Sequence, residues 1–399
     1  MRVNYGQSVH GAEEIKAVIK VLKSSTQMGE NTYAFEKSIS RIFDKKYGLM
    51  VNSASSGLLL TFMSLNFPKG SNFITPVLTF STTISSMVYS GYIPNFVDVK
   101  KNTFCIDEDA FEKKINKKTK GIVVPNLIGN IPDWIKIKKL AKKYNLIIIE
   151  DSADALGSSI DNKPTGYYTD ISVVSFYGSH IINCAGNGGM VCLNNFNIYN
   201  KMKLMRSWGR SSSVFNFSES EKIENRFDTK LDGIKYDKKF IFSELGFNFE
   251  PSEIGAAFGR VQIKTLKTNI KKRTKNYNRH LAFFKKFKKF FELPLQYKNV
   301  NTGWLAFPLL IKSNKYFNRT DLQIFLEKND IQTRVCFTGN ILRQPGFKKI
   351  KCIKSNTYQN ADYIMENAML IGCHHGLKNE HINYMHKTIS KFISSFDNI

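Results

Sequence analysis

Hydrophobic and polar positions follow two different patterns along the first two-thirds of the chain. Apolar residues recur at helical spacing over 12–25 and 31–44, which predicts two amphipathic helices. Short apolar runs bounded by turn residues follow, and these are typical of strands. Such alternation predicts a doubly wound α/β domain with a mostly parallel sheet. The expected strands are 47–53, 71–76, 93–100, 121–127, 146–153, 171–178 and 188–195.

The last third of the chain begins with a long helical pattern. From Pro251 to residue 287 the spacing predicts one helix, with Ser252 as its N-cap and Glu253 in its first turn. We therefore predict a large α/β domain with an N-terminal helical segment over 1–264 and a smaller α+β domain over 265–399. Beyond the long helix the expected strands are 304–311 and 331–337, and the expected helices are 319–330, 358–371 and 380–396.

Composition narrows the class of protein. The chain has 399 residues, 42% of them hydrophobic, which is enough for two apolar cores and argues against disorder. No stretch approaches the roughly 18 consecutive apolar residues of a membrane helix, and residues 1–14 lack the apolar part of a signal peptide. We expect a cytoplasmic protein that does not bind membranes.

Cysteine and charge add two further expectations. The six cysteines lie far apart without a C-x-x-C pair, so we expect reduced thiols and no metal site. The 58 Lys and Arg residues against 33 Asp and Glu residues give a net charge of +25. Because the lysines are scattered among Asn and Ile, we expect no nucleic-acid partner, although a basic surface attracts a nucleotide diphosphate.

Two predicted strands end in polar residues, at the sheet edge where open α/β sheets bind ligands. Segment 51–60 opens a helix with Ser55 and Ser56, whose hydroxyls and free N–H groups suit a phosphate. Segment 147–157 ends its strand at Asp151, a carboxylate that is costly to bury without a cation or a proton donor. The alternative interpretations are an ordinary capped helix start for the first segment and an N-cap or surface turn for Asp151.

Two further segments carry polar residues in loops. Segment 173–191 contains Ser175 and His180 and closes on a glycine-rich turn. Segment 244–259 places Asn248 and Glu250 in a turn just before the long helix. A structural histidine and an ordinary turn are the alternative interpretations.

These four segments, in this order, resemble the DegT/StrS-type family of nucleotide-sugar aminotransferases and their dehydratase relatives, which depend on pyridoxal phosphate (PLP). The resemblance covers nearly the whole chain and implies a type I PLP-dependent aminotransferase fold and an obligate homodimer. It implies that Asp151 pairs with the pyridine nitrogen and that Phe80 stacks on the cofactor. The other cofactor-binding positions it implies are Ser55, Ser56 and Ser175 at the phosphate, Asp154, and Asn248 from the neighbouring subunit.

The lysine that holds PLP in this family is replaced here by His180. No lysine occurs between Lys163 and Lys201, so a neighbouring one does not substitute. Imidazole cannot make the covalent bond that lysine makes, but it moves protons near neutral pH. This exchange resembles the 3-dehydratase branch, which binds PLP or pyridoxamine phosphate (PMP) noncovalently.

The resemblance to that branch implies a reaction. In it the histidine removes a proton from the cofactor methylene of PMP, and the C3 hydroxyl of a nucleotide-linked 4-keto-6-deoxyhexose is expelled. The product leads to 3,6-dideoxysugars of lipopolysaccharide O-antigens, with the nucleotide (GDP, CDP or dTDP) left open. Two alternatives stay open: another lysine-independent PMP chemistry or residual transamination, and an inactive regulator that binds nucleotide sugar or cofactor.

The chain differs from two branches of this family at positions that concern the electron donor and the amino donor. One branch of the family holds a [2Fe–2S] cluster on four cysteines, but this chain has Ser152, Ala153 and 211–213 (all serine) in the corresponding segments, which predicts no cluster. The cluster-free branch regenerates PMP with glutamate and carries a basic residue after the turn where this chain has Glu250. The resemblance thus implies glutamate as the amino donor, but the negative charge of Glu250 would repel the carboxylates of glutamate.

The predicted small domain supplies candidate contacts for the nucleotide sugar. Segment 333–347 resembles the family's segment near that site and contains Arg334, Asn340 and Arg343. The arginine fork matches a diphosphate, since it donates two bonds at once. Ordinary surface arginines are the alternative.

Overall fold

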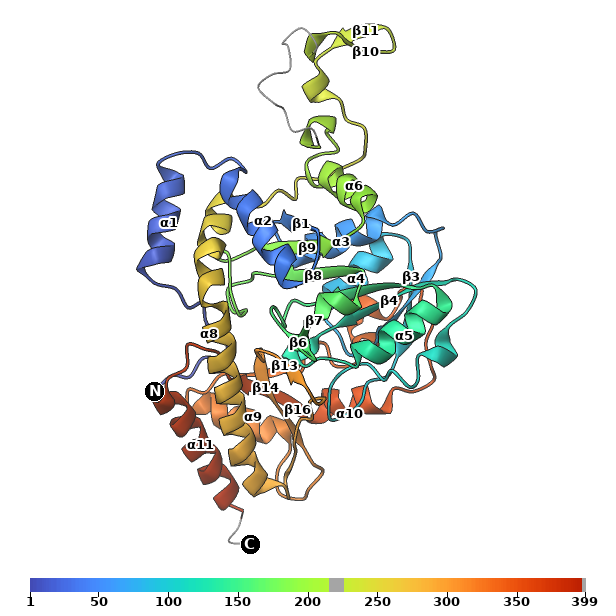
Figure 1. The fold of residues 1–399 in the computed structure, drawn as a ribbon. Coiled ribbons are helices and arrows are strands. Elements are labelled where there is room, and N and C mark those ends of the chain that lie inside the picture. Colours follow the sequence, from blue (N-terminus) through green and yellow to red (C-terminus); the bar gives the residue numbers. More distant parts are fainter. Residues whose placement is uncertain (215–225, 397–399) are drawn as a thin grey trace.

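The computed structural model describes residues 1–214 and 226–396. Its largest element is a seven-stranded sheet in the order β1-β9-β8-β5-β4-β2-β3 (Figure 1). The pairs from β3 to β8 are parallel, whereas β9 runs antiparallel to β1 and β8. The mostly parallel sheet predicted from the sequence is thereby confirmed. Its strands are β1 (Tyr47–Val51), β2 (Asn72–Pro76), β3 (Ile93–Val97), β4 (Thr119–Pro125), β5 (Ile147–Asp151), β8 (Ile171–Ser175) and β9 (Gly189–Leu193).

Helices cover both faces of this sheet. Val173 and Val174 are neighbours on β8 but lie in separate apolar clusters, because successive side chains of a strand face opposite ways. Leu58 of α3 shares the first cluster, and Phe35 of α2 shares the second. The apolar clusters on both faces of the sheet therefore fix the positions of the polar groups at the strand ends. The helices that pack on the sheet are α2 (Glu30–Ile42), α3 (Ala54–Ser64), α4 (Ser81–Tyr89), α5 (Trp134–Tyr144) and α6 (Phe196–Arg206).

A long helix, α8 (Glu253–Phe284), leads from the large sheet to a second, smaller one (Figure 1). Its N-cap is Ser252, whose side chain accepts a hydrogen bond from the N–H of Gly255, so the predicted long helix is confirmed. The predicted domain boundary after residue 264 falls inside α8 and stays a prediction. The smaller sheet is antiparallel in the order β12-β14-β16-β15. Its elements are β12 (Phe291–Glu292), β14 (Ala306–Ile311), β15 (Thr333–Val335), β16 (Ala368–Gly372), α9 (Arg319–Lys328), α10 (Gln359–Asn367) and α11 (Asn379–Ser394).

The prediction of one helix over 358–371 is wrong in its last four residues. Helix α10 ends at Asn367, and the next five residues form β16 between β14 and β15. Alanine, methionine and leucine favour helices intrinsically. Complete burial and pairing with strands on both sides outweigh that preference here.

The N-terminal helices α1 (Ala12–Leu22) and α2 pack on α8. The buried carboxylate of Glu253, in the first turn of α8, accepts hydrogen bonds from the N–H groups of Gly29, Asn31 and Thr32. Burial opposes ionisation, but these bonds hold the pKa of Glu253 below its ordinary value. Glu253 thus caps the positive end of α2 from a distant part of the chain.

The segment between α6 and α8 projects away from both sheets (Figure 1). It carries a hairpin of β10 (Thr229–Leu231) and β11 (Ile234–Tyr236). Several of its apolar side chains face solvent, and Leu245 is 90% exposed. Three short strands, β6 (Ser159–Ile160), β7 (Lys163–Pro164) and β13 (Val300–Asn301), form a separate small sheet. Within residues 1–214 and 226–396, no helix has both the length and the apolar character needed to cross a bilayer.

Candidate active site

A cavity of about 390 Å³ opens where β5 and β8 end and α3 begins. This is the edge of the sheet at which the sequence predicted a ligand site. The structure brings six of the predicted residues together in its wall: Ser55, Phe80, Asp151, Asp154, Ser175 and His180. Residues from distant parts of the chain complete the wall, namely Tyr5, Leu305 and Phe337.

The start of α3 forms one end of the cavity. Ser53 is the N-cap, and its side chain accepts from the N–H of Ser56 at 3.1 Å. Ser56 does not line the cavity, since its hydroxyl donates to Asn52 at 2.6 Å. Gly189 of β9 passes directly beneath, where a Cβ would lie 2.4 Å from the nitrogen of Ala54. A glycine is therefore required there, and the start of α3 can offer its first N–H groups to an anion.

Asp151 ends β5 at the cavity wall and is only 6% exposed. Its carboxylate accepts from the hydroxyl of Thr83 at 2.7 Å and from the N–H of Ala153 at 3.2 Å. Burial raises the pKa of Asp151, and in the part of the chain that the structure describes no cation forms a salt bridge with it. A protonated ring nitrogen would supply the missing positive charge. Thr83 was missed because no sequence signal links α4 to β5.

Asp154 lies beside Asp151 and is 7% exposed. Its carboxylate accepts from the N–H of Ile128 at 3.0 Å. Ile128 has a φ of 64°, an unfavourable value for a β-branched residue, which indicates that the turn is held in place to direct this N–H. Burial and the charge of Asp151 raise the pKa of Asp154 to about 7.

His180 faces Asp154 from the loop after β8. Its Nε2 lies 3.7 Å from Oδ1 of Asp154, too far for a hydrogen bond. On the other side of the ring, Nδ1 lies 3.3 Å from the carbonyl oxygen of Ser175, which can only accept. We therefore assign the proton to Nδ1, which leaves the lone pair of Nε2 in the cavity. Burial and the charge of Arg273 lower the pKa of His180 to about 4, so the ring is neutral at pH 7.

Phe80 precedes α4 and leaves 48% of its surface exposed at the cavity. Its ring meets that of Phe337 edge to face, with centroids 6.3 Å apart. One face of Phe80 thus stays available to a flat ligand.

Other predicted residues lie outside the cavity wall. The side chain of Asn248 accepts from the N–H of Glu250 at 3.3 Å. Asn340 and Arg343 both donate to Asp362, the arginine through two bonds of 2.6 and 2.7 Å. Arg334 is exposed, with its guanidinium 5.5 Å from the ring centre of Tyr5. Tyr5 was missed by sequence reasoning because only the fold brings the N-terminus here.

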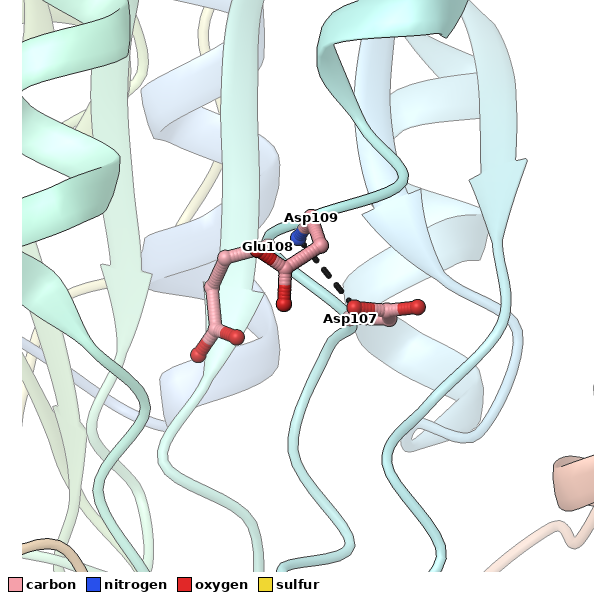
Figure 2. Close-up of side chains that lie close together, drawn as sticks. All are labelled: Asp107, Glu108 and Asp109. Atoms are coloured by element: carbon pink, nitrogen blue, oxygen red, sulfur yellow. Dashed lines mark hydrogen bonds between the residues drawn. The ribbon is translucent and has the colours of Figure 1, made fainter.

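One acidic cluster lies away from this cavity. Asp107, Glu108 and Asp109 place their carboxylates close together, and the N–H of Asp109 donates to Asp107 (Figure 2). The ammonium group of Lys100 lies 2.7 Å from Glu108 and 3.0 Å from Asp109, and Lys136 also pairs with Asp109. The cluster is therefore a network of ion pairs.

Comparisons with known proteins identify the family of the chain. The model of the DegT/DnrJ/EryC1/StrS aminotransferase family matches residues 9–390, and the chain belongs to that family. Lipopolysaccharide biosynthesis protein RfbH of Salmonella typhimurium is 31% identical, over 97% of this chain and 90% of its own length. GDP-4-keto-6-deoxy-D-mannose 3-dehydratase of Yersinia pseudotuberculosis is 28% identical, over 95% of this chain and 96% of its own.

A solved structure is also similar over almost the whole chain. It is GDP-4-keto-6-deoxymannose-3-dehydratase with a trapped PLP-glutamate geminal diamine, and its TM-score is 0.87 at 27% identity. The likeness covers 97% of this chain and 99% of that one. The predicted PLP-dependent aminotransferase fold is thereby confirmed.

The residues of the cavity fit PLP or PMP. Asp151 offers a buried carboxylate without a cation, and Phe80 offers the face of a ring. The start of α3 and the hydroxyls of Ser55 and Ser175 offer donors for a phosphate. No lysine is found among the described residues of the wall, so the group would be held noncovalently.

Proposed function

We propose that this chain is a PLP/PMP-dependent 3-dehydratase that removes the C3 hydroxyl of a nucleotide-linked 4-keto-6-deoxyhexose. The observation that carries this proposal is the neutral imidazole of His180, which faces the cavity where the aminotransferases of the family have a lysine. An imidazole moves a proton but does not hold the cofactor. The names of the Yersinia relative and of the solved structure, both 3-dehydratases, support the same reaction.

The residues of the chain have separate tasks in this proposal. The bound cofactor supplies an electron sink for cleavage of the C3–oxygen bond. The carboxylate of Asp151 keeps the ring nitrogen protonated, and Phe80 fixes the plane of the ring. Ser55 and Ser175 bind the phosphate. The Ser56 hydroxyl already donates to Asn52, so we expect any phosphate contact of Ser56 to use a rotated side chain.

His180 accepts and returns a proton at Nε2. The carbonyl of Ser175 holds the other nitrogen, so the ring presents its lone pair to the cavity rather than rotating away. Asp154 stands 3.7 Å from that lone pair and stabilises the ring once it is protonated. The geometry therefore favours a base that is regenerated in every cycle.

For the partners, we propose a nucleotide diphosphate sugar as substrate and glutamate as amino donor, and we place the reaction in lipopolysaccharide O-antigen biosynthesis. The solved relative with a PLP-glutamate adduct supports glutamate. Glu250 lies outside the cavity wall, so its charge does not oppose glutamate within one subunit. The six cysteines are all free, five of them buried, which suits the reducing cytoplasm where we expect the enzyme to act.

We also propose that the enzyme is a homodimer. The projecting segment before α8 exposes apolar side chains that monomers ordinarily bury, including Phe242 at 58% and Leu245 at 90%. Asn248 belongs to the same segment and lies outside its own cavity. A second copy of the chain would cover these side chains and receive Asn248 at its phosphate site.

The test begins with the PMP-loaded protein and CDP- and GDP-4-keto-6-deoxyhexoses, with and without glutamate, followed by mass spectrometry of the sugar. A 3-deoxy product supports the proposal and identifies the nucleotide. An amino sugar would show transamination without lysine, and an unchanged sugar would favour a regulator that binds without turnover.

Variants at His180 test the base directly. His180→Asn should bind PLP normally but lose at least about 10²-fold in dehydration. The matched control is His381→Asn, at the start of α11 and outside the cavity wall, which should keep full activity. His180→Lys should form an adduct with PLP that borohydride fixes. An active His180→Asn enzyme would overturn the role of His180 as the base.

A further inference from the structure

Arg273 of α8 lies directly behind the loop that carries His180. It is completely buried, with 0% of its surface exposed. One terminal nitrogen donates to the carbonyl oxygens of Ser179 and His180, at 3.2 and 3.1 Å. Arg273 does not line the cavity, so it holds the main chain of the proposed base from outside the cavity wall.

The same guanidinium also holds a second part of the cavity wall. Its other terminal nitrogen donates to the carbonyl oxygens of Trp304 and Leu305, at 3.1 and 3.2 Å, and Leu305 lines the cavity. Its Nε donates to Nδ1 of His375 at 3.1 Å. Five donated bonds from one rigid fork thus fix the His180 loop relative to the segment just before β14 of the smaller sheet.

This buried cation has no carboxylate partner among residues 1–214 and 226–396. Carbonyl dipoles and a neutral histidine surround it instead. Burial lowers the pKa of Arg273 to about 10, so the group is still charged at pH 7. Because the charge is neither paired nor screened by water, it acts on its neighbours more strongly than a surface arginine.

We propose that Arg273 is a positioning residue for His180: it fixes the carbonyl groups of Ser179 and His180, and its charge adds to the effect of burial in opposing protonation of the imidazole. This inference rests on the proposed function for its catalytic meaning. The mechanical part depends on the fork of the guanidinium, and the electrostatic part depends only on its positive charge. The two parts can therefore be separated by substitution.

Several other groups face His180 and share control of its protonation. Asp154 approaches Nε2 to 3.7 Å, and the ring of Tyr177 lies 6.0 Å from the imidazole, centre to centre. A charged Asp154 favours the protonated ring, whereas Arg273 opposes it. The titratable and charged groups around the loop are Tyr5 from the N-terminal segment, Asp151 and Asp154 after β5, Tyr177 on the loop, and Arg273 on α8.

The test measures the pKa of His180 by NMR of the full-length protein labelled in its seven histidines. The His180→Asn variant identifies the signal. In the wild type we expect His180 to titrate well below the ordinary value of about 6.5. Arg273→Gln should raise this pKa by about one unit, because a positive charge is lost. Arg273→Lys should leave it in place, because the charge remains.

Kinetics of the PMP-loaded enzyme separate the mechanical part. Arg273→Lys should lower kcat by about tenfold or more with little change in KM, because the fork that fixes the loop is lost. The matched control is Arg279→Gln, also on α8, where the side chain donates only to Asn379 and Asn383. This control should alter neither the titration nor kcat.

The titrations and the kinetics together decide whether Arg273 controls His180. A wild-type His180 that titrates near 6.5, or an unmoved pKa in a folded Arg273→Gln protein, would overturn the inference. If Arg273→Gln fails to fold, the wild-type titration and the Arg273→Lys kinetics decide. If no sugar is dehydrated but the titrations behave as expected, then the proposed function fails while the control of His180 by Arg273 stands.

Discussion

Two groups of acidic residues in this molecule differ in what surrounds them. Asp151 and Asp154 are buried at the cavity with no cation paired to them among the described residues, and their pKa values are raised. The acids of the other group, Asp107, Glu108 and Asp109 (Figure 2), form ion pairs with Lys100 and Lys136. Acids without partners lower the stability of the free protein and attract a cationic ligand, whereas paired acids maintain the fold.

The largest effect is expected for Asp151→Asn. An amide does not keep a ring nitrogen protonated, so dehydration should fall on the order of 10²-fold or more. The free protein should not lose stability, because an unpaired buried charge is removed. Kinetics and urea unfolding of the cofactor-free protein measure both, with Asp161→Asn in an exposed turn as the control. Strong destabilisation by Asp151→Asn would remove the distinction between the two groups of acids.

The next effect concerns pH and Asp154. The folded pKa of about 7 lies above the unfolded value of roughly 3.9, so the folded protein binds the proton more tightly. This contribution to stability is therefore present at low pH and is lost as pH rises from about 4 to about 7, on the order of a few kcal/mol. Asp154→Asn should flatten that part of the stability profile measured by urea unfolding. Identical slopes in variant and wild type would contradict the raised pKa.

Lys100→Met should have the opposite effect to Asp151→Asn: it should lower the stability of the protein and leave its activity unchanged. The side chain of Glu108 is fully buried and would lose its cation, keeping only the N–H of Asp133 and the hydroxyl of Tyr297. We expect a loss of about 2 kcal/mol in the free energy of unfolding and unchanged kcat. Guanidinium unfolding and steady-state kinetics check this, and a loss of activity without a loss of stability would place the cluster among the functional acids.

The smallest effect is expected at Asp109. Its side chain is 64% exposed, although Lys136 and Lys100 hold its pKa at about 2. Water screens such pairs, so Asp109→Asn should cost no more than about 0.5 kcal/mol, and 1 M salt should abolish the difference. A larger cost that persists in salt would show a more rigid network than the exposure indicates.

The sequence predicted the part of the site that lies at the ends of consecutive strands. Asp151, Ser175 and Ser55 follow apolar runs, and a parallel sheet necessarily brings such strand ends to one edge. Contacts between distant segments were beyond reach, because no periodicity tells which helix packs beside which strand. Thr83, Tyr5 and Arg273 entered only with the structure.

Neighbouring residues also limit what the sequence alone predicts. Arg343 stays a candidate for a diphosphate, although Asp362 accepts two of its hydrogen bonds here, and nothing in the sequence pairs these two residues. The strand β16 was taken for helix because pairing on both sides, rather than its own residues, determines its conformation. Local sequence describes what a residue is able to do, whereas its surroundings determine whether it is available.

The cap that Glu253 places on α2 has a consequence for how the protein is made. Its carboxylate binds the N–H of Asn31, 222 residues earlier in the chain, and both N-terminal helices pack on α8. A ribosome must therefore synthesise well over half of the chain before these two helices meet the surface that buries their apolar sides. Until α8 has been made, the apolar sides of α1 and α2 lack their packing surface, so these helices reach their final positions late in synthesis.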